Sequence, residues 1–337
     1  MLETAATHWL HEATRRSLQA VPKELPAVWL YDARGSRLYD EITRLPDYYL
    51  PRREAEILRA RSSLISERTK ARTLVELGSG SAPNTRFLLD ALSETLERYV
   101  PFDVSEQALH DSAGAIAAAY PAISVEPVVG DFERDFGTMP GDGPRLVAFL
   151  GSTIGNLYPA QRAAFLSALA LELGDDDALV LGVDLVKDVG RLEAAYDDRS
   201  GVTEAFVRNA LRAANRELDA TFEQERFGYD PLWDPVNEWV DVGLRARESH
   251  AVSVRRLGLE LDFAEGERLR VEISAKFRRE AFELELKRAG LSPESWWTDA
   301  AGDFAVVLGA PTELASPKRK ETSCLRAPSA ATSTRSR

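Results

Sequence analysis

Between residues 73 and 184 the chain alternates short apolar runs with longer amphipathic stretches. Apolar runs of about four to eight residues are typical of strands buried on both faces of a sheet, and the stretches between them have helical spacing. Strands that alternate with helices predict a parallel α/β sheet. The predicted strands are Leu74–Leu77, Tyr99–Phe102, Ile123–Val129, Arg145–Leu150 and Asp177–Asp184, and the predicted helices are Thr85–Leu92 and Pro159–Leu173.

The pattern changes after Asp184. Residues Arg191–Glu217 have helical spacing, and Val240–Ser274 alternates polar and apolar residues as an antiparallel sheet does. A helix at Arg279–Ala289 and an apolar strand at Asp303–Leu308 then resume the first pattern. We therefore expect a mid-chain insert, after which the chain returns to its first domain.

The segment before the sheet also has its own character, a helix-like opening followed by an aromatic-rich stretch. Ligands of open α/β sheets bind at the carboxyl ends of the strands, so this segment and the insert are expected to pair as a lid over that edge. Simple packing would also explain the aromatic residues. They are Trp29, Tyr31, Tyr39, Tyr48 and Tyr49.

The predicted domains follow from these changes of pattern. Residues 54–188 and 278–311 form the ligand-binding α/β domain, and residues 1–53 and 189–277 form a second, α+β domain. Residues 316–337 are rich in Ser, Thr, Pro, Ala, Lys and Arg with almost no apolar content, so we expect a disordered tail.

Three of the predicted strands end in turns suited to a nucleotide-like ligand. Gly78 and Gly80 follow the first strand and allow a sharp turn that approaches a ligand closely. Asp103 ends the second strand, 23 residues beyond Gly80, where an acid can accept hydrogen bonds from ribose hydroxyls. Asp131 and Phe132 follow the third strand and could hold an adenine by hydrogen bonding and stacking.

The glycine turn alone is a weak signal, because similar turns occur without a ligand. The dinucleotide fingerprint needs a third glycine three residues after the second, and this chain has Pro83 there, which disfavours an NAD enzyme. Enzymes that methylate nucleic-acid amino groups usually have an Asp/Asn-Pro-Pro-aromatic motif after the fourth strand, where this chain has Gly151–Asn156.

Charge further narrows the ligand class. The net charge is −12, and without the basic tail the body has 36 basic and 53 acidic residues, a net charge of −17. Such a body lacks the basic surface that binds phosphate backbones, so we expect a small-molecule substrate and no nucleic acid.

Cysteine and histidine usage gives no metal site. The only cysteine, Cys324, lies in the tail, which excludes an intramolecular disulfide, and the four histidines show no ligand spacing. No apolar run approaches the ~20 residues that span a bilayer, and the N-terminus lacks a signal-peptide pattern. We expect a cytoplasmic protein without a membrane partner, and a monomer.

Longer motifs make the pattern specific. They are Leu45–Tyr49 (LPDYY), Phe149–Asn156 (FLGSTIGN), Asp184–Asp188 (DLVKD) and Ala195–Asp198 (AYDD). Together with the three ligand turns and the late return strand, they resemble the histidine-specific Nα-methyltransferases of ergothioneine biosynthesis over roughly residues 25 to 310. The resemblance implies a Rossmann-like class I methyltransferase sheet that binds S-adenosylmethionine, and a second α+β domain that binds L-histidine and presents its amine for methylation, up to the trimethyl betaine hercynine.

Matched residue by residue, the resemblance also implies two adjoining sites. The residues implied around S-adenosylmethionine are Tyr31, Gly78, Asn84, Asp103, Asp131 and Phe132, with Asp103 on the ribose. The residues implied around the amino acid are Tyr48, Gly151, Asn156, Tyr196, Val242, Glu272 and Ser274. Asn156 and Tyr196 would hold its carboxylate and backbone, and Glu272 and Ser274 would bind the imidazole, which Tyr48 also reaches. No general base is implied.

Glu272 and Ser274 suit that role physically. Two residues apart on a strand, they point to the same face. Glu272 can accept a hydrogen bond from an imidazole N–H, and Ser274 can donate or accept at the other nitrogen. An edge strand with one solvated face would show the same spacing.

Two departures from the family pattern affect ligand binding, one through the affinity for the cofactor and the other through the specificity for the substrate. Asn84 stands where the family has a lysine near the cofactor, and Val242 stands where it has a methionine at the substrate pocket. Because valine is smaller and stiffer, the pocket could admit an indole or phenol ring. An Nα-methyltransferase of tryptophan or tyrosine therefore remains an alternative, as does a noncatalytic regulator that binds S-adenosylmethionine.

Overall fold

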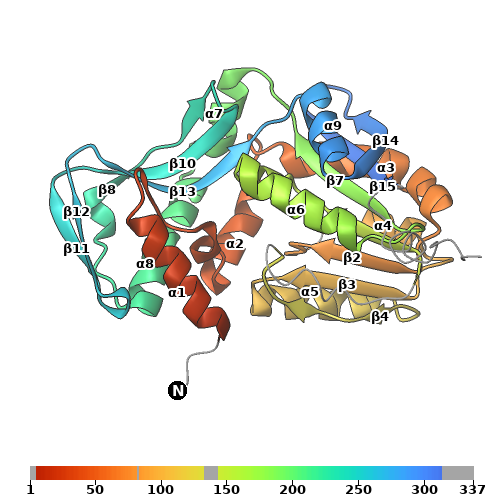
Figure 1. The fold of residues 1–337 in the computed structure, drawn as a ribbon, viewed down its shortest axis with the longest axis horizontal. Coiled ribbons are helices and arrows are strands. Elements are labelled where there is room, and N and C mark those ends of the chain that lie inside the picture. Colours follow the sequence, from red (N-terminus) through yellow and green to blue (C-terminus); the bar gives the residue numbers. More distant parts are fainter. Residues whose placement is uncertain (1–4, 82, 133–142, 313–337) are drawn as a thin grey trace, which may run out of the picture.

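The computed structural model describes residues 5–81, 83–132 and 143–312. The predicted disordered tail and Cys324 lie outside the described residues. Figure 1 shows a large sheet flanked by helices, beside a second group of strands and helices that contains the N-terminal helix.

The large sheet has the strand order β14-β15-β7-β6-β2-β3-β4, and β5 also pairs with β3. The neighbours from β7 through β6 and β2 to β3 are parallel, and β15 is antiparallel to β7. This confirms the predicted parallel sheet and its late return strand. The strands are β2 (Thr73–Leu77), β3 (Arg98–Asp103), β4 (Ser124–Val125), β5 (Val128–Val129), β6 (Arg145–Phe149), β7 (Ala178–Asp184), β14 (Leu291–Thr298) and β15 (Phe304–Pro311).

Two details of this sheet differ from the sequence prediction. The predicted strand Ile123–Val129 is two short strands, because Pro127 has no N–H to donate between β4 and β5. Strand β14 was not predicted. It carries Pro293 and a register shift between Pro293 and Ser295, which an edge strand tolerates.

Helices cover both faces of the large sheet (Figure 1). Successive side chains of a strand point to opposite faces, so Leu74 of β2 belongs to the core that contains Leu58 and Leu88, and Val75 belongs to the core that contains Leu166 and Phe282. The helices on the first face are α3 (Leu50–Thr69), α4 (Thr85–Ala91) and α5 (Glu106–Ala119), and those on the second are α6 (Pro159–Glu172) and α9 (Arg279–Arg288).

The second group of elements joins the insert to the N-terminal segment. Its main sheet has the order β1-β13-β10-β8, with β9 also paired to β10, and β1 is parallel to β13. Helix α2 packs on α8. Its elements are α1 (Ala5–Leu18), β1 (Lys23–Glu24), η1 (Ala27–Leu30), α2 (Ala33–Ile42), α7 (Val189–Tyr196), α8 (Val202–Leu218), η4 (Gln224–Arg226), β8 (Phe227–Tyr229), β9 (Leu232–Asp234), β10 (Trp239–Ala246) and β13 (Arg268–Ala275).

The insert differs from its prediction in two places. The predicted helical stretch Arg191–Glu217 is two helices, α7 and α8, because Gly201 has a positive φ of 72° just before α8. The predicted sheet over Val240–Ser274 is also divided, since β11 (His250–Val254) and β12 (Leu259–Phe263) form a separate hairpin joined by η5 (Arg255–Leu257). The domain boundaries after residues 53, 188 and 277 stay a prediction.

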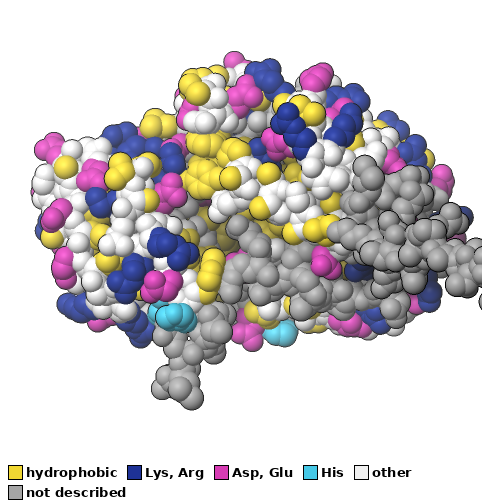
Figure 2. Space-filling model, in the orientation of Figure 1, with side chains coloured by type: hydrophobic (Ala, Val, Ile, Leu, Met, Phe, Trp, Pro, Cys, Tyr) yellow, Lys and Arg dark blue, Asp and Glu magenta, His cyan; other side chains and the backbone are white. Residues whose placement is uncertain are grey.

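The face drawn in Figure 2 has basic and acidic side chains interspersed, with hydrophobic side chains gathered near its centre. Among the helices of the described ranges, none is both long and apolar enough to cross a membrane.

Candidate active site

A pocket of about 260 Å³ lies at the carboxyl ends of β2, β3 and β6, under the N-terminal segment. Nine of the thirteen residues implied by the resemblance line it. They are Tyr31, Tyr48, Gly78, Asn84, Asp103, Asp131, Phe132, Gly151 and Asn156. The other four, Tyr196, Val242, Glu272 and Ser274, lie beside it and are connected through the contacts below.

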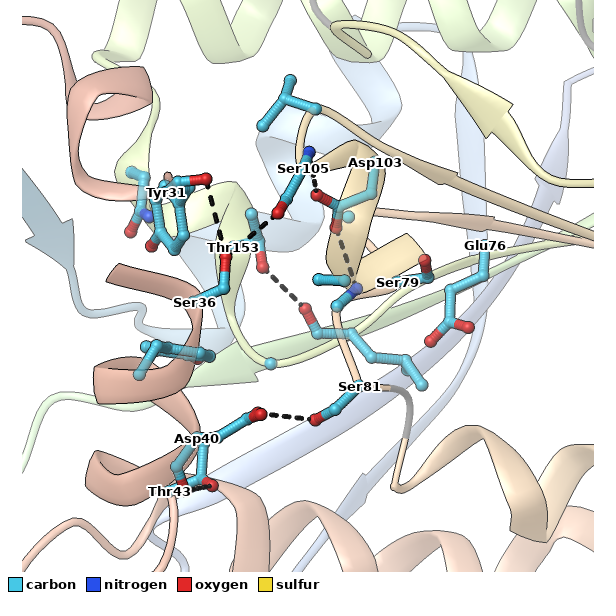
Figure 3. A pocket seen from close by; sticks show the side chains of 18 of the residues that line it. Tyr31, Ser36, Asp40, Thr43, Glu76, Ser79, Ser81, Asp103, Ser105 and Thr153 are labelled. Carbon is cyan, nitrogen blue, oxygen red and sulfur yellow. Dashed lines mark hydrogen bonds between the residues drawn. The ribbon is translucent and has the colours of Figure 1, made fainter. Parts of the chain in front are cut away.

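Asp103 is held in place by the glycine turn after β2. Its Oδ2 accepts a hydrogen bond from the Gly80 amide at 2.8 Å, and its Oδ1 accepts one from the Ser105 amide at 2.8 Å (Figure 3). Burial raises the pKa of Asp103, while these amide donors oppose the rise. Gly78 and Gly80 both have a positive φ, of 66° and 49°, which glycine adopts without strain. The turn therefore presents an oriented carboxylate to the pocket.

Phe132 forms the apolar part of the pocket. Its ring packs edge-on against Phe149 with 5.0 Å between ring centroids, and against Phe165 of α6 at 5.9 Å. A Cβ atom at Gly78 would lie 3.8 Å from the Phe132 ring, so the glycine turn and this ring are neighbours. The Phe132 ring therefore gives the pocket an apolar surface beside the glycine turn whose Gly80 amide binds Asp103.

Helix α2 forms the opposite wall (Figure 3). Ser36 and Ser105 share a hydrogen bond of 3.1 Å, and Ser81 donates to Asp40 Oδ1 at 2.8 Å. The carboxylate of Asp32 caps α2 by accepting from the Arg34 and Gly35 amides. The Ser36–Ser105 and Ser81–Asp40 bonds, which were not predicted, tie the N-terminal segment directly to the ligand turns of the large sheet.

Glu272 links the large sheet to the insert. Its Oε1 accepts hydrogen bonds from Asn156 Nδ2 at 2.9 Å and from the Tyr31 hydroxyl at 3.4 Å. Burial raises the pKa of Glu272 to about 7. Val242 is its partner in the β10–β13 register and is buried, so the departure from methionine lies directly beside this carboxylate.

Ser274 lies two residues further along β13, and its hydroxyl oxygen accepts hydrogen bonds from two side chains. The Tyr196 hydroxyl donates to Ser274 Oγ at 2.7 Å, and Lys276 Nζ donates to it at 2.9 Å. Lys276 also donates to the Tyr196 hydroxyl at 2.8 Å. The Tyr196 ring packs edge-on against Tyr48 with 6.1 Å between centroids. The two aromatic residues and Ser274 therefore form one wall, whose polar atoms are ordered by Lys276.

Lys276 belongs to a buried charge cluster that was not predicted. Its Nζ lies 2.9 Å from Asp184 Oδ2, and Lys187 forms an ion pair with the same carboxylate. The Tyr49 hydroxyl also donates to Asp184, at 2.9 Å. Burial opposes the charge of Lys276, but Asp184 and Tyr196 together raise its pKa, whereas burial lowers the pKa of Lys187 to about 8. The sequence signal that could have predicted Lys276 is its spacing, because Glu272, Ser274 and Lys276 are each two residues apart.

Two further carboxylates line the pocket without having been predicted as site residues. Glu54 of α3 accepts a hydrogen bond from the Gly151 amide at 2.7 Å and one from Asn84 Nδ2 at 2.9 Å. Glu76 of β2 accepts from the hydroxyls of Thr85 and Tyr99. Burial raises the pKa of each carboxylate to about 7.

The chemistry available here is that of binding and orientation. Carboxylates, tyrosines and an amide surround the pocket, and the residues described contain no group of three or more His, Cys, Asp or Glu placed to hold a metal ion. Burial raises the pKa of Tyr31 and of Tyr48 well above the ordinary value, so both hydroxyls keep their protons near neutral pH. They can serve as hydrogen-bond partners but not as ionised bases.

Comparison with known proteins agrees with this geometry. The model of the family described as histidine-specific methyltransferase, SAM-dependent, matches residues 10–311. A histidine N-alpha-methyltransferase of Mycolicibacterium smegmatis is 52% identical over 306 residues, which cover 90% of this chain and 95% of that protein. One from Mycobacterium tuberculosis is 49% identical, covering 89% of this chain and 95% of that protein.

A more distant relative is ergothioneine biosynthesis protein 1 of Neurospora crassa, 29% identical over 82% of this chain but only 32% of that longer protein. The α/β sheet with its antiparallel return strand is the arrangement that the resemblance to this family predicted. The match over residues 10–311 shows that this chain belongs to the family of S-adenosylmethionine-dependent, histidine-specific methyltransferases.

Proposed function

We propose that this protein transfers methyl groups from S-adenosylmethionine to the α-amine of L-histidine, as far as the trimethyl betaine hercynine, in ergothioneine biosynthesis. The observation that carries the proposal is that Glu272 and Ser274 lie on the same face of β13, and that Glu272 is bonded to Asn156 at the pocket. The similarity to a histidine N-alpha-methyltransferase at 52% identity supports the same activity.

The hydrogen-bond directions at this pair favour a neutral imidazole. Ser274 Oγ already accepts from Tyr196 and Lys276, so its own hydrogen is left to donate to the unprotonated ring nitrogen. Glu272 can accept from the other nitrogen, which carries hydrogen. An indole has only an N–H donor and cannot accept from Ser274, and a phenol must make both bonds at one oxygen, whereas an imidazole offers its donor and its acceptor on separate nitrogens. A buried polar group left unpaired costs binding energy.

Asn156 and Tyr196 are proposed to hold the carboxylate and backbone of the amino acid. Asn156 Nδ2 donates two hydrogens, of which one is used toward Glu272 in this structure. The Tyr196 hydrogen is directed at Ser274, so Asn156 is the better placed donor to a carboxylate. Tyr48 is proposed to reach the imidazole from the pocket side.

The cofactor is proposed to lie across the turns after β2 and β3. Asp103 would accept from the ribose hydroxyls, Asp131 would bind the adenine, and Phe132 would support it with its ring. Gly78, Asn84 and Tyr31 would surround the remainder. In this arrangement residues 54–188 and 278–311 form the cofactor-binding domain of a monomeric enzyme, and residues 1–53 and 189–277 form its substrate-binding domain. Tyr31 and Asn156 each reach the ligand of the other domain.

The proposed reaction is an in-line displacement. The nitrogen lone pair of the substrate forms a bond to the methyl carbon as the carbon–sulfur bond breaks, and the electron pair of that bond stays on the sulfur of S-adenosylhomocysteine. The protein contributes by holding nitrogen, carbon and sulfur in line at a contact of ~3–3.5 Å and by excluding water. Since the ordinary pKa of an α-amine is about 8, its proton must leave before attack.

Tryptophan and tyrosine remain the second candidate substrates, because Val242 leaves more space beside Glu272 than methionine would. Incubation with S-adenosylmethionine and each aromatic amino acid, followed by mass spectrometry, tests both candidates. Successive addition of one, two and three methyl groups to histidine supports the proposal. Methylation of tryptophan or tyrosine in preference to histidine would replace it with the second candidate.

A further inference from the structure

Glu54 is a buried carboxylate that lines the cofactor pocket without a cationic partner. Its side chain comes from α3, and the residue is 2% exposed. Within the described ranges no Lys, Arg or His forms an ion pair with it. Because an ionised carboxylate taken out of water is costly unless it is paired, a cationic group of a ligand in this pocket would stabilise the charged form of Glu54.

Neighbouring residues make room for the Glu54 carboxylate and fix its direction. A Cβ atom on Gly182 of β7 would lie 2.1 Å from Glu54 Oε1, so only glycine there leaves space for this oxygen. The Gly151 amide donates to Oε1 and Asn84 Nδ2 donates to Oε2. Each carboxylate oxygen has used one lone pair in these bonds and keeps another as an acceptor.

Glu54 also lies where the amino-acid end of the cofactor is expected. It is bonded to Gly151, in the turn after β6, whereas Asp103 is at the end of β3, and β2 with its glycine turn lies between these two strands. A cofactor whose ribose is held at Asp103 can therefore extend its methionine portion across Gly78 toward Glu54. Glu76 also lines the pocket, where it accepts hydrogen bonds from Thr85 and Tyr99 and forms no ion pair within the described residues.

We propose that Glu54 binds the α-ammonium group of the methionine portion of S-adenosylmethionine, an inference that rests on the proposed placement of the cofactor. The ammonium group carries three N–H donors that can use the remaining lone pairs of Glu54 in charge-assisted hydrogen bonds. The sulfonium is also positive but has no N–H or O–H to donate. The carboxylate therefore recognises the end of the cofactor that does not react and that the product retains.

Calorimetric titration with three ligands tests this assignment on the full chain. S-adenosylmethionine carries both the ammonium and the sulfonium, S-adenosylhomocysteine carries only the ammonium, and methylthioadenosine carries neither. The Glu54→Gln variant should bind the first two about tenfold or more weakly, since a hydrogen bond to a charged group contributes about 1.5–3 kcal/mol, and should bind methylthioadenosine as the unaltered protein does.

Glu56→Gln is the matched control, because Glu56 lies on the same helix but pairs with Arg53 and the Ala300 amide outside the pocket. It should leave all three affinities unchanged. Thermal melting of the unliganded Glu54→Gln variant checks that the fold is retained, because the amide removes a buried charge but offers only one acceptor oxygen to the Gly151 amide and Asn84 Nδ2.

Three results would overturn the assignment of Glu54. If Glu54→Gln lost affinity for S-adenosylmethionine alone, the carboxylate would interact with the sulfonium. An equal loss for all three ligands would mean that Glu54 only maintains the shape of the pocket, and no loss at all would mean that it does not contact the cofactor. Failure of the proposed function is seen separately, as an absence of histidine methylation by the unaltered protein even though it binds these ligands.

Discussion

Asn156 Nδ2 donates a hydrogen bond of 2.9 Å to Glu272 Oε1, which joins the turn after β6 to strand β13 of the insert. The residue proposed to hold the substrate carboxylate is thus already in contact with the residue proposed to bind its ring. The substrate must either fit beside this bond or replace it. Because the bond fixes the separation of Asn156 and Glu272, it also limits the distance between the carboxylate and the ring of an amino acid that can bind both residues.

Replacement of Glu272 by alanine removes the proposed acceptor for the imidazole N–H. We expect Glu272→Ala to raise the KM for histidine by about tenfold to a hundredfold, the cost of about 1.5–3 kcal/mol for a hydrogen bond to a charged group. The affinity for S-adenosylmethionine should stay within about twofold, since no cofactor contact is proposed for this side chain. Steady-state kinetics measure the KM and calorimetry measures the cofactor affinity. Glu272→Gln keeps one acceptor oxygen, so its KM for histidine should lie between those of the unaltered protein and Glu272→Ala.

Replacement of Asp103 by alanine should have the opposite pattern. The carboxylate is proposed to hold the ribose, and it also accepts from the Gly80 and Ser105 amides. Cofactor affinity should fall about tenfold or more, while the KM for histidine at saturating cofactor changes little. If Asp103→Ala and Glu272→Ala weaken cofactor binding to the same extent, the proposed division into two sites is wrong.

Lys276 is expected to act on the substrate through Ser274 and Tyr196. Lys276→Met removes a donor from both hydroxyls and, among the residues that the structure describes, leaves Asp184 with only Lys187 as an ion-pair partner. We expect a higher KM for histidine, an unchanged affinity for S-adenosylmethionine, and a loss of stability of up to about 3–5 kcal/mol, as for other broken buried pairs. Urea denaturation gives the stability, and Lys287→Met, at an exposed position on α9, is the control. A loss of cofactor binding in parallel with the rise in KM would indicate general damage instead.

The stability of the unliganded protein should depend on pH through its buried carboxylates. Burial raises the pKa of Glu54 to about 7, above an unfolded value near 4.5. Such a group stabilises the folded state fully below about pH 4.5, and this contribution is lost as the pH rises through about 7. The free energy of unfolding of the unaltered protein should therefore fall between about pH 5 and 8 relative to Glu54→Gln, by at most about 3 kcal/mol.

Urea denaturation of both proteins at several pH values measures this difference. The comparison with the variant cancels the titration of other groups. A constant difference across the range would mean that Glu54 is ionised throughout or is paired in solution.

The parallel sheet could be predicted because β2, β3, β6 and β7 are almost continuously apolar and each is followed by a recognisable turn. Strand β14 could not, since Pro293 and Glu294 interrupt its pattern and its pairing with β15 depends on tertiary contact. Propensity is a weak guide for such an edge strand.

The site residues divide in the same way. Asp103 and Asp131 follow predicted strands, so their places on the sheet edge were predictable from local sequence. Glu54 was not, because it stands near the start of a charged helix and reaches the pocket only through the packing of α3 over Gly182. Lys276 could have been predicted, because it is two residues beyond Ser274 and continues the alternation of Glu272 and Ser274.

The parallel pairing of β1 with β13 has a practical consequence for recombinant work. Lys23 and Glu24 cover the outer edge of the strand that carries Glu272 and Ser274. A shortened version that starts at the methyltransferase sheet would uncover this edge, and an uncovered edge strand invites pairing between molecules and aggregation. Expression of active protein should therefore require residues from at least Lys23 onward.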